Sequence, residues 1–297
     1  MQESYIKING CEYYVQEYCN SSDTNCASVI LLHGWPDDCS LWRFQIPALV
    51  QSGYRVICFD WLGHGKSEKT KNLSKYTLAS LSSDVVGLID ALKLRKTHCI
   101  AHDYGAVVGW ELAERYPEKL VSYVAISVGH PLVLVRNVSL ESLIKSWYLI
   151  FNPLSISVPI YRFMNGFFLR WVLRGHPDRE SVIDKFLQDK DPFYIQVWEK
   201  ANPVIPVVLS SFQKKQSQLK NLIKVPTLGV WSSGDNFMAE DQMKKTGSLV
   251  QEKWQYLRLS NCNHWPQLEN YQELNQHLLE WLNCSDLALR QQTEGFE

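Results

Sequence analysis

The sequence predicts an α/β protein in which a mostly parallel sheet is covered by helices on both faces. Short runs rich in apolar and β-branched residues end at Gly, Pro, Asp or polar turns, and segments of helical period separate many of these runs. Such alternation of strand and helix is typical of parallel sheets with helices on both faces. With 297 residues, the chain can form one large α/β body or two smaller domains.

The predicted sheet has eight strands. The first two form a hairpin within residues 4–18, where alternating apolar and polar runs flank Asn9-Gly10, a dipeptide suited to a tight turn. A helix is predicted at 78–93, because apolar residues recur there at three- and four-residue steps. The other six strands are predicted at 28–32, 55–59, 98–101, 122–126, 227–231 and 254–259.

The alternation stops in the middle of the chain. No strand run occurs between about residues 131 and 222, where the sequence is helical in pattern, aromatic and interrupted by proline. We therefore predict an inserted helical cap at 131–222 and a core formed by 1–130 and 223–285. The remaining residues, 286–297, are predicted to be a polar C-terminal tail.

Composition limits the partners and cofactors of the chain. A formal net charge of −1 and a pI near 6.7 provide no basic field that would attract nucleic acid or an anionic membrane by electrostatics alone. The most apolar region, 147–173, is interrupted by charged residues, so no membrane span is predicted. Residues 1–10 lack an export signal, and eight scattered cysteines contain no Cys-x-x-Cys pair. We expect a cytoplasmic protein with reduced thiols, no metal and no cofactor.

The stretch IAHDYGA, residues 100–106, contains a candidate nucleophile. Asp103 directly follows a predicted strand and precedes a predicted helix, at the sheet edge where open parallel sheets bind ligands. A strained strand-to-helix elbow needs small residues two positions before and two after, and Ala101 and Gly105 meet this need. The elbow presents one side chain to the cleft, and here that side chain is a carboxylate.

Five motifs in order resemble those of the α/β hydrolases, and within them the epoxide hydrolases. The resemblance covers about residues 5–283 and implies an α/β-hydrolase fold, a doubly wound, mostly parallel eight-stranded sheet with an inserted helical cap. It also implies the order nucleophile, acid and base, met here by Asp103, Asp235 and His264. The motifs are HGWPDD (33–38), DWLGHGKS (60–67), HDYGA (102–106), SSGDNF (232–237) and NCNHWPQLE (261–269).

Asp235 has two competitors for the role of catalytic acid. Glu240 and Asp241 lie close by, but their pattern is typical of a solvated helix start. The stretch after the preceding strand, SVGHPLVL, contains no carboxylate. Asp235 is therefore the predicted acid.

A carboxylate nucleophile limits the reaction. Attack on an ester or amide would give an anhydride, whereas attack on a saturated carbon gives an ester that water can cleave, so epoxides and haloalkanes are the two obvious substrate classes. The resemblance implies that an epoxide forms an alkyl ester with Asp103, and that water activated by His264 and Asp235 hydrolyses the ester to a diol. It also implies an oxyanion hole formed by the backbone N–H groups of Trp35 and Tyr104.

The resembling enzymes stabilise the opening oxygen with two cap tyrosines. The stretch SWYLIF resembles the one that carries the first, which is Tyr148. The best match to the second is WEKAN, which places Glu199 where a tyrosine is expected. Tyr148 alone can suffice, or Tyr194 or Tyr161 can substitute. The remaining alternative is a protonated Glu199, which requires burial to raise its pKa well above ~4.3.

The aromatic cap indicates a small lipophilic substrate, because catalytic clefts bury such molecules among apolar walls. Trp147, Phe151, Tyr194 and Glu199 are the predicted substrate contacts. Nucleic acid is not an expected partner, and a homodimer is left open.

Two other functions compete with epoxide hydrolysis. Dehalogenases on this fold usually carry Trp after the nucleophile and Asn after the His-Gly pair, or Arg after the nucleophile, whereas this chain has Tyr104 and Trp35. The second alternative is a slow-turnover protein that binds a lipophilic ligand. This alternative stays open because Glu199 stands where the resembling enzymes have a tyrosine. A complete set of nucleophile, acid and base argues against it, since a binding protein has no need of one.

Overall fold

The computed structural model describes residues 1–20, 26–137, 139–203 and 222–294, and its centre is an eight-stranded sheet. The strand order across the sheet is β1-β2-β4-β3-β5-β6-β7-β8. All eight predicted strand runs coincide with strands, with ends that differ by at most two residues. The strands are β1 Gln2–Ile8, β2 Cys11–Tyr18, β3 Ser28–Leu32, β4 Arg55–Phe59, β5 Thr97–His102, β6 Leu120–Ile126, β7 Thr227–Ser232 and β8 Trp254–Leu259.

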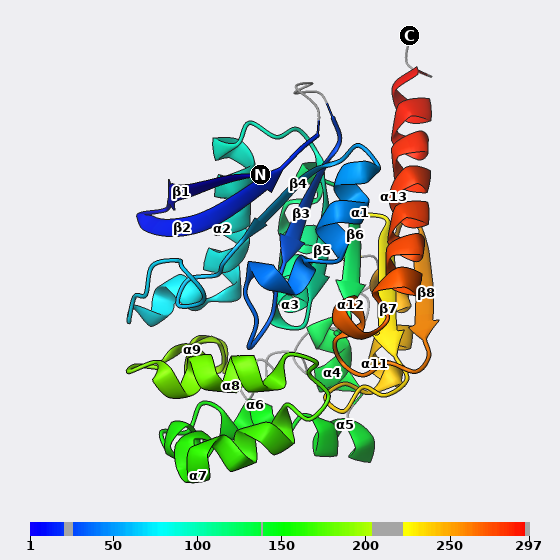
Figure 1. Cartoon of the computed structure of the whole chain (residues 1–297). Helices are drawn as coiled ribbons and strands as arrows, with labels where there is room; N and C mark the ends of the chain where they lie inside the picture. Colours follow the sequence, from blue (N-terminus) through cyan, green and yellow to red (C-terminus); the bar gives the residue numbers. More distant parts are fainter. Residues whose placement is uncertain (21–25, 138, 204–221, 295–297) are drawn as a thin grey trace.

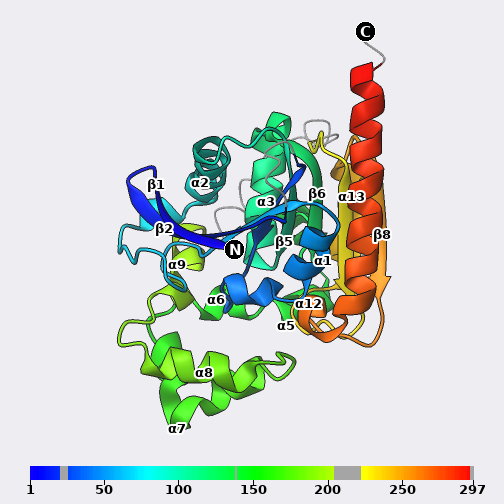
Figure 2. The same ribbon diagram turned by 45° about the horizontal axis from the view of Figure 1, so that its top comes forward.

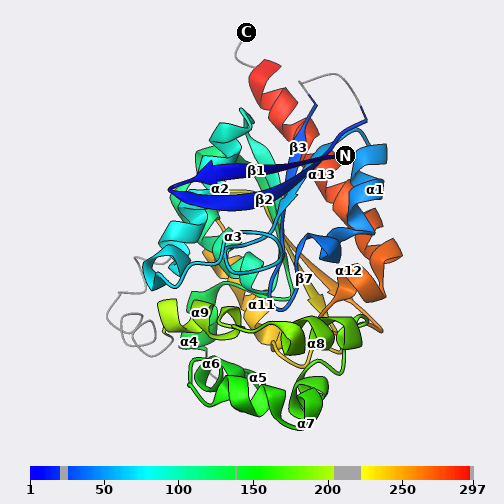
Figure 3. The same ribbon diagram turned by 60° about the vertical axis from the view of Figure 1, so that its left-hand side comes forward.

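Most of the sheet is parallel. β1 pairs antiparallel with β2, and β2 pairs antiparallel with β4, so the hairpin forms one edge of the sheet beside α2 (Figure 3). The other six strands, in the sheet order β4-β3-β5-β6-β7-β8, pair in parallel. This topology confirms the predicted doubly wound, mostly parallel eight-stranded sheet.

Helices cover both faces of this sheet (Figure 1). α2 and α3 pack on one face, and α1 and α13 pack on the other. None of the described helices has the length and hydropathy that a membrane crossing requires. The α-helices are α1 Gln45–Gln51, α2 Leu78–Ala91, α3 Tyr104–Arg115, α4 Pro131–Arg136, α5 Leu140–Lys145, α6 Tyr148–Phe151, α7 Ser157–Val172, α8 Arg179–Gln188, α9 Tyr194–Ala201, α11 Glu240–Thr246, α12 Pro266–Glu269 and α13 Tyr271–Glu294; the 3-10 helices are η1 Cys39–Trp42, η2 Leu73–Tyr76, η3 Pro117–Lys119 and η5 Gly247–Leu249.

Strand β3 shows why the sequence forms a doubly covered sheet. All five of its residues are buried. Ile30 and Leu32 belong to the apolar cluster under α2 and α3, whereas Val29 and Leu31 belong to the cluster under α1 and α13. Successive side chains of a strand point to opposite faces, so an uninterrupted apolar run is stable only where both faces are covered.

Helices α4–α9 lie together at the carboxyl ends of the parallel strands (Figures 1 and 2). In the chain they fall between β6 and β7, within the segment predicted as a cap. Residue 138 and residues 204–221 of that segment lie outside the described residues, and the boundaries 131–222 stay a prediction. The placement of α4–α9 brings their inner side chains over the strand ends, where the candidate catalytic residues lie.

Most of the predicted C-terminal tail is helical. Helix α13 continues through residue 286 as far as Glu294, and only 295–297 lie outside the described residues. The Asp286 carboxylate accepts a hydrogen bond from the Tyr54 hydroxyl (3.0 Å) and lies 3.1 Å from Nε2 of the buried His98. These contacts hold this part of the helix against the core.

Candidate active site

Asp103 lies in a sharp turn between β5 and α3. Its backbone has φ 52° and ψ −123°. L-residues rarely adopt this strained conformation, and it persists only where the surrounding structure enforces it. Two glycines make room for the turn. A Cβ on Gly34 would lie 2.4 Å from Asp103 Cβ, and one on Gly105 would lie 2.5 Å from the Leu32 and His33 carbonyl oxygens. The predicted elbow is therefore present, with Gly34 as a further requirement.

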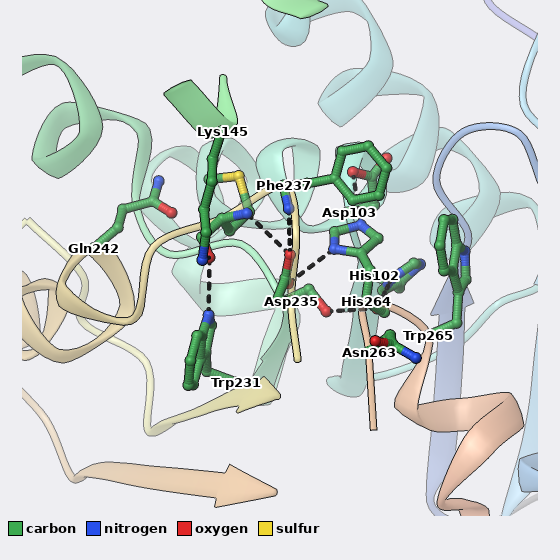
Figure 4. Close-up of polar contacts among 12 residues, drawn as sticks. His102, Asp103, Lys145, Trp231, Asp235, Phe237, Gln242, Asn263, His264 and Trp265 are labelled. Carbon is green, nitrogen blue, oxygen red and sulfur yellow. Dashed lines mark hydrogen bonds and ion pairs between the residues drawn. The ribbon is translucent and has the colours of Figure 1, made fainter. Parts of the chain in front are cut away.

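The three predicted catalytic side chains form a continuous row of polar contacts (Figure 4). His264 Nδ1 lies 2.9 Å from Asp235 Oδ2, and His264 Nε2 lies 3.3 Å from Asp103 Oδ2. Asp235 follows β7 and His264 follows β8, so both side chains project from the same sheet edge as Asp103. Both are almost completely buried.

The loop after β7 fixes the Asp235 carboxylate. Asp235 Oδ1 accepts hydrogen bonds from the backbone N–H groups of Phe237 (2.8 Å) and Met238 (2.9 Å). The Met238 carbonyl oxygen in turn accepts from Trp231 Nε1 and Lys145 Nζ, both at 3.2 Å (Figure 4). Oδ2 is left for the histidine. Glu240, one of the two competitors, pairs with Lys244 and Tyr256 instead.

The backbone of His264 is also held. Its carbonyl oxygen accepts a hydrogen bond from Ser127 Oγ (2.8 Å) and one from His102 Nε2 (2.9 Å). His102 is the last residue of β5 and Ser127 directly follows β6, so two neighbouring strands position a residue in the loop after β8. Such support limits the rotation of the imidazole between its two carboxylates.

Electrostatics favours an ion pair between His264 and Asp103. Burial by itself lowers the pKa of His264, but the charges and hydrogen bonds of Asp235 and Asp103 outweigh it and raise the pKa to about 10. Burial by itself raises the pKa of Asp103, but the hydrogen bond and charge of His264 outweigh it and hold the pKa below its ordinary value. At neutral pH the resting site therefore contains a His264 imidazolium paired with the Asp103 carboxylate.

A cavity of about 160 Å³ opens above Asp103 and is mostly apolar. The Trp35 backbone N–H donates to Asp103 Oδ1 (3.1 Å), which is the position predicted for one oxyanion-hole donor. The peptide bond between Trp35 and Pro36 is cis. Besides Asp103 and His264, the cavity is lined by Trp35, Tyr104, Tyr148, Tyr161, Trp198, Glu199, Phe237, Trp265 and further, mainly aliphatic, side chains.

Three of the predicted substrate contacts do not line this cavity. Trp147, which directly precedes α6, and Phe151, which ends it, pack against Phe168 of α7, with ring centroids 5.7 and 5.9 Å away. Tyr194 lines a separate cavity on the other side of Trp35, where its ring packs against His64 at 5.3 Å. These three predictions are corrected.

Tyr148 and Glu199 do line the cavity. The Tyr148 hydroxyl lies 3.6 Å from Met238 Sδ, a weak partner that leaves its proton available to a ligand. Burial raises the pKa of Glu199 to about 7, and Asp103 adds to the rise while a hydrogen bond from Asn152 opposes it. The Glu199 carboxyl is therefore neutral in a large share of molecules at neutral pH.

Two asparagines that the sequence analysis did not single out organise these side chains. Asn152 Nδ2 donates to Glu199 Oε1 (3.0 Å), and Asn152 Oδ1 accepts from the Tyr161 hydroxyl (2.7 Å). Asn202 Nδ2 donates to the Tyr104 hydroxyl (2.7 Å). Asn202 ends the WEKAN stretch and could have been chosen from it, whereas nothing local marks Asn152.

The described residues contain no group of three or more His, Cys, Asp or Glu side chains that could hold a metal ion.

Comparisons with known proteins indicate the same fold. The family model described as "alpha/beta hydrolase fold" matches residues 27–151. The bifunctional epoxide hydrolase 2 of Sus scrofa is 25% identical over 293 residues, which cover 86% of this chain and 51% of the pig protein, so the chain spans about half of that relative. Epoxide hydrolase B of Mycobacterium tuberculosis is 41% identical over 100 residues, 34% of this chain and 28% of that protein.

A solved structure shows the same fold. The epoxide hydrolase of Bacillus megaterium, crystallised with an inhibitor, superposes with a TM-score of 0.80 at 20% identity and covers 94% of this chain and 100% of its own. The chain therefore has the alpha/beta hydrolase fold. The relatives named above are epoxide hydrolases, which the motifs in the sequence also resemble.

Proposed function

We propose that this chain is a hydrolase that opens a small lipophilic epoxide to a diol through an ester on Asp103. The observation that carries the proposal is an elbow carboxylate in contact with His264, itself in contact with Asp235, at the floor of an apolar cavity. A serine at this position would favour acyl transfer, whereas a carboxylate is suited to attack on saturated carbon. The epoxide hydrolase names of the relatives support the same reaction.

In the first half-reaction, Asp103 Oδ2 attacks a ring carbon of the epoxide. The new bond joins Oδ2 to that carbon, the carbon–oxygen bond of the ring breaks, and the ring oxygen takes a proton from a donor in the cavity. Oδ1 becomes the carbonyl oxygen of the ester. It already accepts the backbone N–H of Trp35, and the backbone N–H of Tyr104 also lowers the pKa of Asp103. These two groups are the proposed oxyanion hole.

In the second half-reaction, His264 activates water. Esterification removes the negative charge of Asp103, which is one of the causes that raise the pKa of His264. The imidazole then becomes a better base at the stage that needs one. The imidazolium first returns a proton to the donor that protonated the ring oxygen. Nε2 then takes a proton from water as the hydroxide adds to the Asp103 carbonyl carbon. The tetrahedral intermediate collapses by breaking the bond between its carbon and Oδ2, the leaving alkoxide takes the imidazolium proton to give the diol, and the Asp103 carboxyl passes its proton to His264. Asp235 stabilises the imidazolium that forms.

The donors to the ring oxygen are proposed to be Tyr148 and protonated Glu199. Of the alternatives in the sequence, Tyr194 does not line the cavity, and the Tyr161 hydroxyl already donates to Asn152. Glu199 Oε1 accepts from Asn152, so a proton on Oε2 can be directed into the cavity. The carboxyl then takes the place of a second tyrosine.

Ring opening is expected to depend on the ionisation of Glu199. Because its pKa is about 7 and the protonated form donates, kcat should fall as pH rises through this value and level off at the rate that Tyr148 alone supports. Glu199→Gln retains N–H donors at every pH, so the decline in kcat near pH 7 should be absent from this variant. Glu199→Ala should lower kcat by about 10- to 100-fold at pH 6. The measurement is the pH profile of diol formation.

Glu118→Gln is the matched control, because Glu118 is an exposed carboxylate at η3, outside the cavity. It should retain the wild-type profile. A Glu199→Gln profile identical to that of the wild type would exclude Glu199 as the titrating donor.

The reaction itself is tested with a panel of lipophilic epoxides and matched haloalkanes given to the wild-type chain. Diol formation is expected from at least one epoxide, and halide release is expected to be absent or much slower. Halide release without diol formation would indicate the dehalogenase alternative. Tight binding of panel members with no turnover of either class would indicate a lipophilic-ligand-binding protein, and either result would overturn the proposal.

A further inference from the structure

Large apolar side chains are exposed on one part of the molecule. Of the fourteen exposed large hydrophobic residues in the described chain, ten lie between residues 140 and 171, on α5–α7 and the turns that join them. We call these ten the apolar face. They are Leu140, Leu143, Ile144, Ile150, Leu154, Ile156, Phe163, Met164, Phe167 and Trp171. Soluble chains rarely gather so many in one region unless the surface binds something.

The most prominent part of the apolar face is a turn inside α7. Phe163–Gly166 interrupt the helix, and Met164, Asn165 and Gly166 have φ values of 48°, 54° and 80°. Phe163 is 67% exposed and Phe167 is 66% exposed. A left-handed turn that presents apolar side chains to water is unfavourable by itself, so it indicates a role outside folding. Helix α7 lies farthest from the sheet in all three views (Figures 1, 2 and 3).

The same helices line the candidate active site from inside. Tyr148 and Leu149 of α6 face the cavity, whereas the neighbouring Ile150 is 66% exposed. On α7, Val172 lines the cavity and the adjacent Trp171 is 51% exposed. The apolar face is therefore the outer surface of the wall that covers the cavity.

The segment that carries the apolar face has a net positive charge. Residues 131–175 contain five Lys and Arg and one Glu, although the whole chain has a net charge of −1. Arg174 Cζ lies 4.8 Å from the centre of the Trp171 ring, and Arg170 on the same helix pairs with Glu180. Tryptophan beside arginine is a combination that suits the boundary between water and lipid.

We infer that the apolar face docks on an anionic lipid surface, with the Phe163–Phe167 turn and Trp171 inserted among the head groups. An arginine stacked on an exposed tryptophan, as Arg174 is on Trp171, favours negatively charged lipids. Pairing of this face with a second copy of the chain is less favourable, because a twofold interface would bring the same basic residues together. The net charge of the whole chain does not predict such a surface, since the basic residues of 131–175 are balanced by acidic residues elsewhere.

The test is co-sedimentation of the full chain with vesicles. Phosphatidylcholine vesicles that contain phosphatidylserine should bind the wild type at least about tenfold more strongly than phosphatidylcholine alone, and high salt should weaken this binding. Phe163→Ser/Phe167→Ser should bind at least about tenfold more weakly than the wild type. Leu143→Ser/Ile144→Ser on α5 is a second variant in case the first does not fold.

Leu287→Ser is the matched control, because Leu287 is exposed on α13, whose C-terminal end points away from α4–α9 (Figure 1). It should bind vesicles as the wild type does. Absence of wild-type binding to the anionic vesicles, or unchanged binding by both apolar-face variants, would overturn the inference. A wild-type dimer that the variants convert to monomers would show that a second copy covers the face. The assay needs no turnover, so its failure leaves the proposed reaction standing.

Discussion

Asp103→Asn protein is expected to lose at least about 10⁴-fold in kcat for diol formation, equivalent to about 5.5 kcal/mol of transition-state stabilisation. An amide is a poor nucleophile, so the ester cannot form, while the amide oxygen can still accept the Trp35 N–H and keep the elbow in place. Steady-state kinetics and thermal unfolding, measured together, separate lost chemistry from lost structure. Asp241→Asn, at an exposed ion pair with Lys245, is the control and should retain activity.

Isotope labelling gives a second readout for the same residue. When the wild type turns over one equivalent of epoxide in ¹⁸O-water, the heavy oxygen should appear in Asp103 and not in the first diol released. Water adds to the Asp103 carbonyl carbon, and the oxygen that leaves with the diol is the original carboxylate oxygen. Peptide mass spectrometry locates the label. A first diol that carries the heavy oxygen, with unlabelled Asp103, would show that water attacks the epoxide directly.

His264→Gln protein is expected to accumulate the ester at about one equivalent per chain, with kcat reduced by about 10³-fold or more. Glutamine cannot take a proton from water, whereas Asp103 remains able to attack the epoxide. Intact-mass measurement should show a gain equal to the mass of the whole epoxide, since ring opening releases no leaving group. The adduct should be absent from Asp103→Asn/His264→Gln protein.

The electrostatics of the site explain why His264 is needed in the second half-reaction and not in the first. In the wild type, Asp103 and Asp235 together raise the pKa of His264 to about 10, and loss of the Asp103 charge on esterification lowers it again. The imidazole is therefore a base mainly after the ester has formed. Free His264→Gln protein that forms no adduct with any epoxide that the wild type converts would contradict an ester intermediate.

The strands and the core could be predicted from the sequence because their signal is local. Runs such as Ser28–Leu32 are apolar at every position, which is required when both faces of a strand are covered. The end of α13 could not be predicted in this way. It depends on contacts of Asp286 with Tyr54 and His98, residues far away in the sequence, and the polar residues after 286 locally resemble a tail.

The candidate site was predictable in part for a similar reason. Asp103, Asp235 and His264 each follow a strand, and parallel strands bring their carboxyl ends to one edge of the sheet. No comparable rule predicts which cap side chains contact the substrate. Trp147 and Tyr148 are adjacent, yet Tyr148 faces the cavity while Trp147 packs against Phe168. Nothing around Asn152 indicated that it would join Glu199 to Tyr161.

The sequence by itself determined the eight strands, the helices that cover them and the presence of a carboxylate at the elbow, because these depend on residue type and on periodicity along the chain. The tertiary structure alone decided which side chains share the cavity, that Glu199 has a pKa of about 7, and that apolar residues of α5–α7 face outward. Burial and exposure arise from packing between segments far apart in the chain, and local sequence does not record which side of a helix that packing will cover.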